Sequence, residues 1–383
     1  MRSIVLHGAP MLINGKTHIG RPALAIEERK IPTPRPGEVL VQTHSVGICG
    51  SDYHSCRTRE DGAVVFSGPL SPPVVLGHEV CGKVVDVGSG VRSLCSEQWV
   101  VLESLITCGE CSACRRTHSR HCKTPALLGL TLDGAMADFL VVPAQHCWPV
   151  PRALWDTVEA DLVTDILTLA EPTACVVNAF FFSGCTLASG DRVLVLGQGP
   201  LGITASVLAE HITGRRPVVI DRSEHRCMLV EKIGSGRPLL CDVGIHNADD
   251  VVEAARDAVS GESFDVIVET AGIPGACLSS FVQALGAEGT LIYLARLGET
   301  IALPADELVG KALRLVGSRG PNGGAIPRAF SLIAACLDRL KPLVTRRVGY
   351  DQIIDVLTES DYLREGKVVF RPRICENLLR NGQ

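Results

Sequence analysis

Two short polar segments hold the side chains best suited to chemistry in this chain of 383 residues. Residues 47–54 (GICGSDYH) bring a thiol, a hydroxyl, a carboxylate and an imidazole together, and residues 77–79 (GHE) add a second imidazole and a second carboxylate. Both segments follow apolar runs typical of β-strands. A catalytic zinc ion binds mixed cysteine, histidine and carboxylate ligands and keeps one position open for water or substrate. The two segments therefore predict a catalytic metal site.

Three or four side chains could hold this metal, and two others could move protons beside it. Taken alone, a buried cysteine or a histidine at a strand end is more often a core residue than a ligand, so the prediction depends on the combination. Ser51 and His54 are left for proton transfer. The predicted ligands are Cys49, His78 and one acid, either Glu79 or Glu171.

Four cysteines in a second cluster predict a different kind of metal site. Three recur at intervals of three residues and the fourth follows after a loop, a spacing that can surround one tetrahedral zinc ion completely. Such a closed site is structural. The alternative is a disulfide pair, but the sixteen cysteines are spread over a long chain without a visible export signal, which favours reduced thiols. The predicted ligands are Cys108, Cys111, Cys114 and Cys122.

A glycine-rich turn between a strand and a helix predicts a dinucleotide site. The turn is 197–202 (GQGPLG), a helix-like segment follows it, and the next strand ends in Asp221, nineteen residues after Gly202. In this fingerprint the helix N-terminus faces the pyrophosphate. Asp221 would bind the ribose hydroxyls and repel a 2′-phosphate, which favours NAD over NADP, whereas Arg222 and Arg226 add positive charge nearby. The predicted cofactor-binding residues of this motif are Gly197, Gly199, Pro200, Leu201, Gly202 and Asp221.

Composition and charge exclude several classes of function. The chain is 46% hydrophobic and 21% charged, as in soluble globular proteins, and its length allows two domains. A net charge of −5 without a long basic block argues against a nucleic-acid or an anionic membrane partner. The apolar region 162–182 contains Asp165, Glu171, Pro172 and Asn178, which argues against a membrane span. We expect a cytoplasmic protein.

The spacing of strands and helices predicts an α/β protein. Short strands broken by glycine and proline run to about residue 150 and suggest a β-rich, partly open barrel. Later, apolar strands alternate with helical segments, as in a doubly wound parallel sheet. About 65 residues follow the last strand, and we expect them to return to the first domain. The expected strands of the parallel sheet are 191–196, 217–221, 264–268, 289–294 and 313–317.

These motifs, in this order, resemble those of the zinc-containing medium-chain dehydrogenase/reductase family, the alcohol dehydrogenase superfamily. The resemblance covers about residues 38–320, and it points to the polyol (sorbitol-like) and threonine dehydrogenase branch because Glu171 stands where other alcohol dehydrogenases have a cysteine ligand. It implies a GroES-like catalytic domain of residues 1–172 and 319–383 and a Rossmann NAD-binding domain of residues 173–318. The active site would lie in the cleft between them.

The resemblance implies how the predicted metal would be held. Cys49 and His78 would bind the catalytic zinc, and Glu79 would be a further or an exchangeable ligand. Glu171 would bind the zinc directly or through its water. Asp52 would support these ligands without touching the metal. Together with the closed cysteine cluster, this implies two zinc ions per chain, one catalytic and one structural.

The resemblance also implies a reaction, in which a secondary alcohol gives its hydride to NAD and becomes a ketone. Ser51 would take the proton of the substrate hydroxyl, and His54 would pass it towards solvent. Arg226 would contact the adenosine ribose. Only 4% of the residues are aromatic and the region near the site is rich in small and polar groups. We therefore expect a small polyhydroxylated substrate: a polyol, a sugar, a cyclitol or an aminocyclitol.

Two alternatives and three departures from the family pattern accompany this expectation. The alternatives are an L-threonine 3-dehydrogenase-like enzyme and a non-catalytic zinc- and NAD-binding regulatory protein, which would not need Ser51 and His54. Residues 96–100 (SEQWV) replace the usual Gly-Asp-Arg-Val, the loop 56–73 is lengthened, and Cys175 could compete as a ligand. The oligomers of the family imply a homodimer or a homotetramer.

Overall fold

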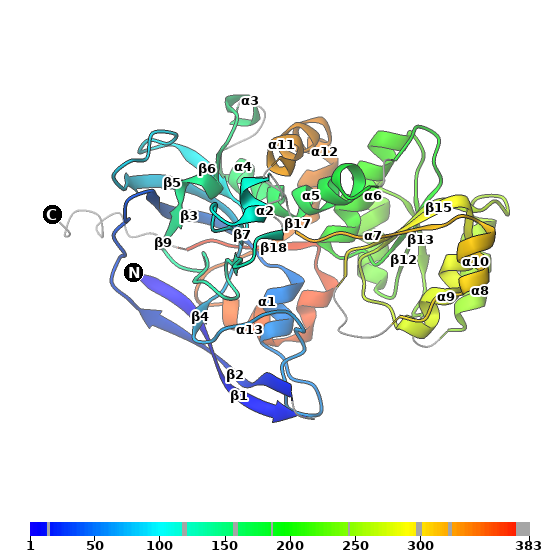
Figure 1. Cartoon of the computed structure of the whole chain (residues 1–383), viewed down its shortest axis with the longest axis horizontal. Helices are drawn as coiled ribbons and strands as arrows, with labels where there is room; N and C mark the ends of the chain where they lie inside the picture. The colour runs from blue at the N-terminus through cyan, green and yellow to red at the C-terminus, as the bar shows by residue number, and fades with distance from the viewer. Residues whose placement is uncertain are drawn as a thin grey trace.

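Two sheet-based units, joined by a layer of helices, make up the computed structural model of the chain (Figure 1). The structure describes residues 1–13, 16–116, 121–155, 160–184, 187–243, 246–295, 301–320 and 324–372. Within these ranges the strands form sheets of seven, six, three and two strands. The first unit is rich in antiparallel strands and the second is a parallel sheet with helices, so the predicted α/β fold class is confirmed.

The seven-stranded sheet is assembled from parts of the chain that lie far apart in sequence. Its strands follow the order β10-β6-β5-β3-β18-β17, and β9 also pairs with β3. The antiparallel pairing of β18 with β3 returns the chain to the first unit after the parallel sheet is complete. The limits of the two domains stay a prediction, and residues 373–383 lie outside the described ranges. The strands are β3 (Glu38–Gly47), β5 (Glu79–Val87), β6 (Trp99–Leu102), β9 (Phe139–Pro143), β10 (Cys147–Pro149), β17 (Val344–Val348) and β18 (Lys367–Phe370).

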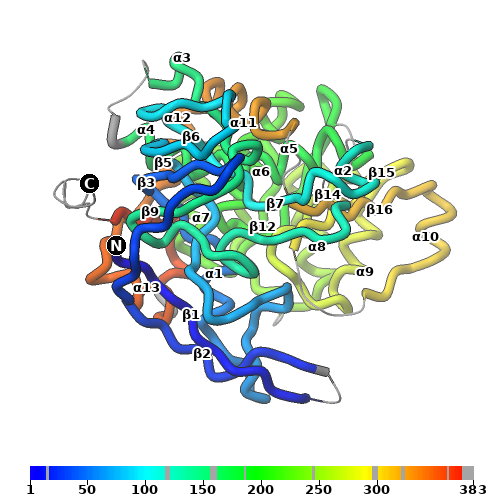
Figure 2. Tube along the Cα trace, turned by 60° about the vertical axis from the view of Figure 1, so that its left-hand side comes forward, coloured from blue at the N-terminus to red at the C-terminus, as the bar shows by residue number. Residues whose placement is uncertain are grey.

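A long hairpin extends from this unit and is visible as the dark-blue arm in Figure 2. It is formed by β1 (Arg2–Ile13) and β2 (Lys16–Glu28), and β1 also pairs with β4 (Val74–Val75). We predicted only short strands in the first 150 residues, and this is wrong for β1 and β2, which span 12 and 13 residues. Gly8 and Pro10 resemble strand breakers, but a register shift around Gly8 absorbs the irregularity and the pairing continues beyond it.

The six-stranded sheet of the second unit is parallel throughout, with the order β13-β12-β11-β14-β15-β16. Numbered from β11, this is the order 3-2-1-4-5-6 of a doubly wound dinucleotide-binding sheet. The expected strands are confirmed, although β15 begins earlier, and β13 was missed because its sequence, RPLL, has no long apolar run. The strands are β11 (Val193–Leu196), β12 (Val218–Asp221), β13 (Arg237–Leu240), β14 (Phe264–Glu269), β15 (Leu285–Tyr293) and β16 (Arg314–Gly317).

Helices flank the parallel sheet and fill the space between the units (Figure 1). The segment Leu162–Phe182 has the length and apolar composition of a membrane span, but 83% of its most apolar window is buried inside the protein, as in a core helix. The helices along the sheet are α6 (Pro200–Thr213), α7 (Glu224–Ile233), α8 (Ala248–Asp257), α9 (Gly275–Gln283) and α10 (Ala305–Gly310). The others include α3 (Arg152–Trp155), α4 (Ala160–Leu167), α5 (Ala170–Val177), the π-helix η3 (Asn178–Phe182), α11 (Ala325–Ala335), α12 (Leu337–Leu340) and α13 (Ile353–Thr358).

One buried carboxylate joins α4 to three parts of the first unit. Asp165 is fully buried, and its oxygens accept hydrogen bonds from Ser45 of β3 at 3.0 Å and from the Nε and Nη2 atoms of Arg371 at 2.8 and 2.7 Å. The Nε of Arg347 on β17 donates to the same carboxylate. Because an ionised acid is costly to bury without such partners, the two arginines and Asp165 stabilise one another.

We expect Asp165→Asn to lower the free energy of unfolding by roughly 2–4 kcal/mol, because the amide loses both charge-assisted pairs inside the protein. Urea titration followed by circular dichroism measures the change. The matched control is Asp338→Asn, whose side chain is 93% exposed and should lose less than about 0.5 kcal/mol. Equal losses in the two variants would contradict the structural role of Asp165.

Candidate functional site

The candidate metal ligands lie where two neighbouring strands meet. Gly47 at the end of β3 lies opposite Glu79 at the start of β5 in the antiparallel pair, so the residues just beyond β3 and just before β5 come together. Cys49 caps the N-terminus of helix α1 (Gly50–Ser55), and His78 precedes β5. Ligand atoms of Cys49, His78 and Glu79 all lie within 4.8 Å of one another. A thiol, an imidazole and a carboxylate at this separation form a donor set that zinc accepts.

Asp52 holds this arrangement from behind. Its carboxylate is fully buried and accepts hydrogen bonds from the backbone amides of Cys49 at 3.0 Å and Gly77 at 3.2 Å, and it lies 3.8 Å from Nδ1 of His78. Gly77 has a φ of +92°, and a Cβ at this position would lie 2.8 Å from the side chain of Met136. The turn before His78 therefore requires glycine, and Asp52 fixes it relative to α1.

The two candidate carboxylates have different neighbours. Glu79 is 1% exposed, and its Oε2 forms an ion pair with Nζ of Lys367, the first residue of β18. Glu171 lies in the first turn of α5, where its Oε1 accepts a hydrogen bond from Ser104 at 2.5 Å and lies 3.8 Å from Sγ of Cys175. Among the described residues Glu79 completes the compact group, and Glu171 lies beside it.

The charges around this group suit a bound cation. Burial raises the pKa of Glu171, and the negative charge of Glu79 adds to this effect. Burial lowers the pKa of His78, but the negative charges of Asp52 and Cys49 outweigh it and raise the pKa well above its usual value. The raised pKa of His78 indicates that the surrounding acids and thiol favour positive charge, which a divalent ion would supply.

Ser51 and His54 lie on α1, three residues apart and therefore on neighbouring turns of one face. The Oγ of Ser51 is buried and has no hydrogen-bond partner within the part of the chain that the structure describes. The side chain of His54 reaches the surface. The surrounding protein and then the positive charge of Arg57 lower the pKa of His54. One short helix thus leads from a buried hydroxyl beside the candidate ligands to a solvent-exposed imidazole.

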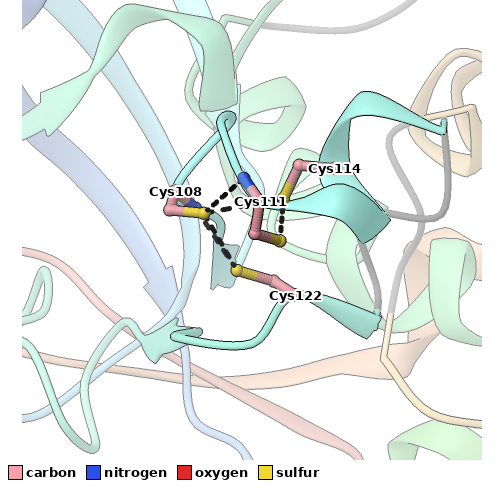
Figure 3. A group of neighbouring side chains, drawn as sticks. All are labelled: Cys108, Cys111, Cys114 and Cys122. Carbon is pink, nitrogen blue, oxygen red and sulfur yellow. Dashed lines mark hydrogen bonds between the residues drawn. The ribbon is translucent and has the colours of Figure 1, made fainter.

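The four cysteines of the second cluster converge on one point, as Figure 3 shows. The Sγ atoms of Cys108 and Cys114 are 3.9 Å apart, those of Cys111 and Cys114 are 3.5 Å apart, and those of Cys122 and Cys108 are 3.6 Å apart. Cys111 caps the N-terminus of α2 (Ser112–Arg115). The backbone amides of Cys114 and then Lys123 lower the pKa of the Cys111 thiol to about 6, which favours the thiolate that a metal binds.

This geometry fits a structural zinc ion, because all four predicted donors surround a common centre and separations of 3.5–3.9 Å suit the edges of a tetrahedron of thiolates. The segment 105–127 around the four cysteines contains little regular structure among its described residues. It has the short helix α2 and the two-stranded sheet of β7 (Leu105–Ile106) and β8 (Ala126–Leu127). A bound zinc ion would therefore be the main link between Cys108, Cys111 and Cys114 on one side of this segment and Cys122 on the other.

The predicted glycine turn follows β11 and opens α6, whose N-cap is Gly199. Gly197 has a φ of +91°, which favours glycine, and a Cβ on Gly202 would lie 1.8 Å from the carbonyl oxygen of Gly197. Both positions thus require glycine for the reasons expected from the sequence. Pro200, which has no N–H, and Leu201 form the first turn of α6, where the remaining free backbone amides can bind an anion.

Asp221 ends β12 beside this turn. Its Oδ2 accepts a hydrogen bond from the amide of Gln198 at 2.5 Å, and its Oδ1 accepts one from the amide of Ser223 at 2.8 Å. The guanidinium of Arg226 lies about 3.7 Å from where a Cβ of Gly199 would be. The structure therefore brings the glycine turn, Asp221 and Arg226 together at the carboxyl edge of the parallel sheet.

Two residues that contact the candidate ligands were missed by sequence reasoning. Lys367 lies 288 residues from Glu79 along the chain and is 1% exposed, yet a lysine at the start of a strand looks like an ordinary surface residue. Ser104, the partner of Glu171, lies just after β6 and belongs to no recognisable motif. Neither carries a local signal, because each is defined only by long-range packing.

We expect Cys111→Ser to lower the zinc content of the purified protein by one ion per chain, because a closed tetrahedral site loses most of its affinity with one thiolate. Elemental analysis of the variant beside the unmodified protein measures this. Cys95→Ser is the matched control, since Cys95 is exposed and belongs to neither cluster. An unchanged zinc content in Cys111→Ser would contradict the site.

Two family models match the chain. The model described as "Alcohol dehydrogenase GroES-like domain" matches residues 35–152, and the one described as "Zinc-binding dehydrogenase" matches residues 200–335. The first match covers β3 to β10 and both metal-binding candidates, and the second begins at α6 and covers the rest of the parallel sheet. The predicted resemblance to the zinc-containing dehydrogenases is therefore confirmed.

Curated relatives and solved structures agree with this assignment over almost the whole chain. An L-threonine 3-dehydrogenase of Pyrococcus abyssi is 31% identical over 91% of this chain and 96% of its own. A scyllo-inosose 3-dehydrogenase of Thermotoga maritima is 29% identical over 92% and 95%. A solved structure described as "putative alcohol dehydrogenase from Thermotoga maritima" superposes with a TM-score of 0.85 at 28% identity, over 97% and 99% of the two chains. The chain belongs to the zinc-containing medium-chain alcohol dehydrogenase superfamily and is an NAD(P)-dependent zinc alcohol dehydrogenase.

Proposed function

We propose that this enzyme oxidises a secondary alcohol of a small polyhydroxylated compound, a polyol, a sugar, a cyclitol or an aminocyclitol, to a ketone with NAD as hydride acceptor. The observation that carries the proposal is the compact group of Cys49, His78 and Glu79, in which the histidine and the acid are buried, with Glu171 beside it. A site with two acids and one thiol differs from the closed cluster of four cysteines. It can leave one coordination position of a bound zinc ion open for water or substrate. Its polar neighbours suit a substrate with several hydroxyl groups.

Cys49, His78 and Glu79 would hold the catalytic zinc, and Glu171 would ligate it directly or through water. When bound, zinc polarises the hydroxyl of the substrate and NAD accepts the hydride. Glu79 is already paired with Lys367, so it would bind a metal ion more weakly than an unpaired carboxylate. This pairing supports the role of Glu79 as an exchangeable ligand, as the family resemblance implies.

Ser51 and His54 would carry the proton away from the reacting hydroxyl. The buried Oγ of Ser51 has no partner in the described protein, so its lone pairs are free to accept the proton of the substrate. Its own proton can then move towards His54, one turn further along α1 and open to solvent. His54 must be neutral to receive it, and the lowered pKa of His54 favours that state.

NAD is the proposed cofactor in preference to NADP, bound at Gly197, Gly199, Pro200, Leu201, Gly202, Asp221 and Arg226. Two amide donors orient the carboxylate of Asp221 beside the glycine turn, where it would accept the ribose hydroxyls and repel a 2′-phosphate. The guanidinium of Arg226 beside Gly199 supports a contact with the adenosine ribose.

The second candidate substrate is L-threonine. Two relatives of similar identity are named for scyllo-inosose and for L-threonine, so the identity values favour neither.

We also propose a cytoplasmic homodimer or homotetramer. The proposed domains are residues 1–172 with 319–383, and residues 173–318. The exposed side chains of Val309 and Leu315, 83% and 44% exposed near the edge strand β16, support an oligomer because apolar surface at a sheet edge favours association.

Turnover should appear for one substrate class when NADH formation is followed over polyols, cyclitols, aminocyclitols and L-threonine with enzyme that holds two zinc ions per chain. Ser51→Ala should lower kcat by about 10²-fold or more without loss of zinc, because only the proton acceptor is removed. The matched control, Ser96→Ala, changes an exposed hydroxyl and should leave kcat unchanged. Full turnover in Ser51→Ala would reject the proton path, and turnover on L-threonine alone would replace the polyol proposal.

We expect Arg57→Gln to shift the acidic limb of the kcat profile to higher pH by roughly 0.5 unit. The positive charge of Arg57 lowers the pKa of His54, so its removal raises that pKa and leaves His54 protonated over a wider range of pH. Arg59→Gln is the control, because Arg59 is on the same loop but pairs with Asp61. A shift to lower pH, or the same shift in both variants, would contradict the role of His54.

A further inference from the structure

Glu269 occupies a position in the parallel sheet that the reaction described so far does not use. It is the last residue of β14 and lies opposite Leu196, the last residue of the neighbouring β11. The strand order of the sheet reverses between these two strands. In doubly wound sheets the ligand binds outside the carboxyl ends of the strands at this reversal. Glu269 is therefore at the base of the dinucleotide crevice.

The carboxylate of Glu269 organises the turn that follows β14. Its side chain is fully buried, and Oε1 accepts hydrogen bonds from three successive amides, those of Ala271 at 3.0 Å, Gly272 at 2.6 Å and Ile273 at 3.2 Å. Gly272 has a φ of +73°. A single acceptor thus holds three amides in a tight loop, which would otherwise be unpaired at the end of a buried strand.

This turn touches the glycine turn directly. A Cβ on Gly197 would lie 2.7 Å from the Cβ of Ala271 and 2.9 Å from its Cα, so the two turns are in contact at backbone distance. The hydroxyl of Thr270 donates to the carbonyls of Leu196 at 2.8 Å and Gly197 at 3.0 Å. The position of Gly197 therefore depends on the turn that Glu269 shapes.

The second oxygen of Glu269 has no hydrogen-bond partner among the described residues. Burial raises the pKa of Glu269 to about 7, and the three amides offset this only in part. A buried acid with one unpaired oxygen destabilises the fold, so its presence at the crevice needs a compensating role. The three amide bonds beside the cofactor turn supply one.

We infer that Glu269 is a positioning residue of the cofactor site: by holding the 270–273 turn against Gly197, it sets the shape of the crevice that receives the dinucleotide. The inference rests on the proposed use of NAD. It assigns Glu269 no contact with the reacting atoms, so its loss should act on cofactor affinity and leave the chemical step at saturating cofactor nearly unchanged.

The test measures the Kd for NADH by fluorescence titration of the zinc-loaded full-length enzyme, together with kcat at saturating NAD. Glu269→Ala should raise Kd at least 10-fold while kcat changes less than 3-fold. Glu269→Gln should stay within 3-fold of the unmodified enzyme in both, because an amide oxygen can accept the same three bonds. Glu253→Ala, which removes an exposed carboxylate on α8, is the matched control and should change neither value.

Thr270→Val keeps the test decisive if Glu269→Ala does not fold. This variant removes only the hydroxyl that ties the turn to Leu196 and Gly197, and it should raise Kd by 3- to 10-fold. Unchanged affinity in Glu269→Ala, or in Thr270→Val where the former does not fold, would overturn the inference. So would a Glu269→Gln variant as weak as Glu269→Ala. An unmodified enzyme that binds NADH but oxidises no polyol rejects only the substrate proposal, whereas one that binds no NADH rejects both.

Discussion

The buried carboxylate of Asp52 accepts the backbone amides of Cys49 and Gly77, and through them it fixes the end of β3 relative to the start of β5. The antiparallel register of these strands brings Gly47 opposite Glu79, but register alone places backbones and not ligand atoms. The two amide bonds add the missing constraint. They hold the N-cap of α1 and the turn before His78 at one separation, so the thiol of Cys49 and the imidazole of His78 converge.

Around this constraint the site gathers groups from four distant segments. Glu171 comes from α5 in the layer between the units, Ser104 follows β6, and Lys367 begins β18. The glycine turn of β11 and α6 comes from the second unit. The candidate ligands and the glycine turn lie on different segments, so the arrangement of the candidate site depends on the packing of both units as well as on local motifs. This is the usual arrangement of enzymes that bind their cofactor on one domain and their metal on another.

Sequence reasoning succeeded where chemistry is set by local spacing. The glycine turn needs glycine at Gly197 and Gly202 for reasons visible in a short strand-turn-helix pattern, and four cysteines around one loop can converge on little else than a metal. It failed for the long hairpin of β1 and β2. Gly8 resembles a residue that ends a strand, but it lies at a register shift and the pairing of the two strands continues beyond it.

It also left open the choice between Glu79 and Glu171, because that choice depends on distances across the fold. The structure places Glu79 in the compact group, although Glu79 also needs Lys367, which no motif announced. Spacing along the chain therefore predicts which residue types can meet, and only the packed structure decides which of two equivalent acids is nearer.

The ion pair of Glu79 with Lys367 also bears on the order in which the site can form during synthesis. A chain leaving the ribosome presents Cys49, His78 and Glu79 early, but the cation that neutralises Glu79 is made 288 residues later, after the whole parallel sheet. A carboxylate is costly to bury without its counter-ion, so burial of Glu79 gains its compensating charge only when β18 packs against β3. The environment of Glu79 in the first unit is thus completed by a strand that follows the whole second unit in sequence.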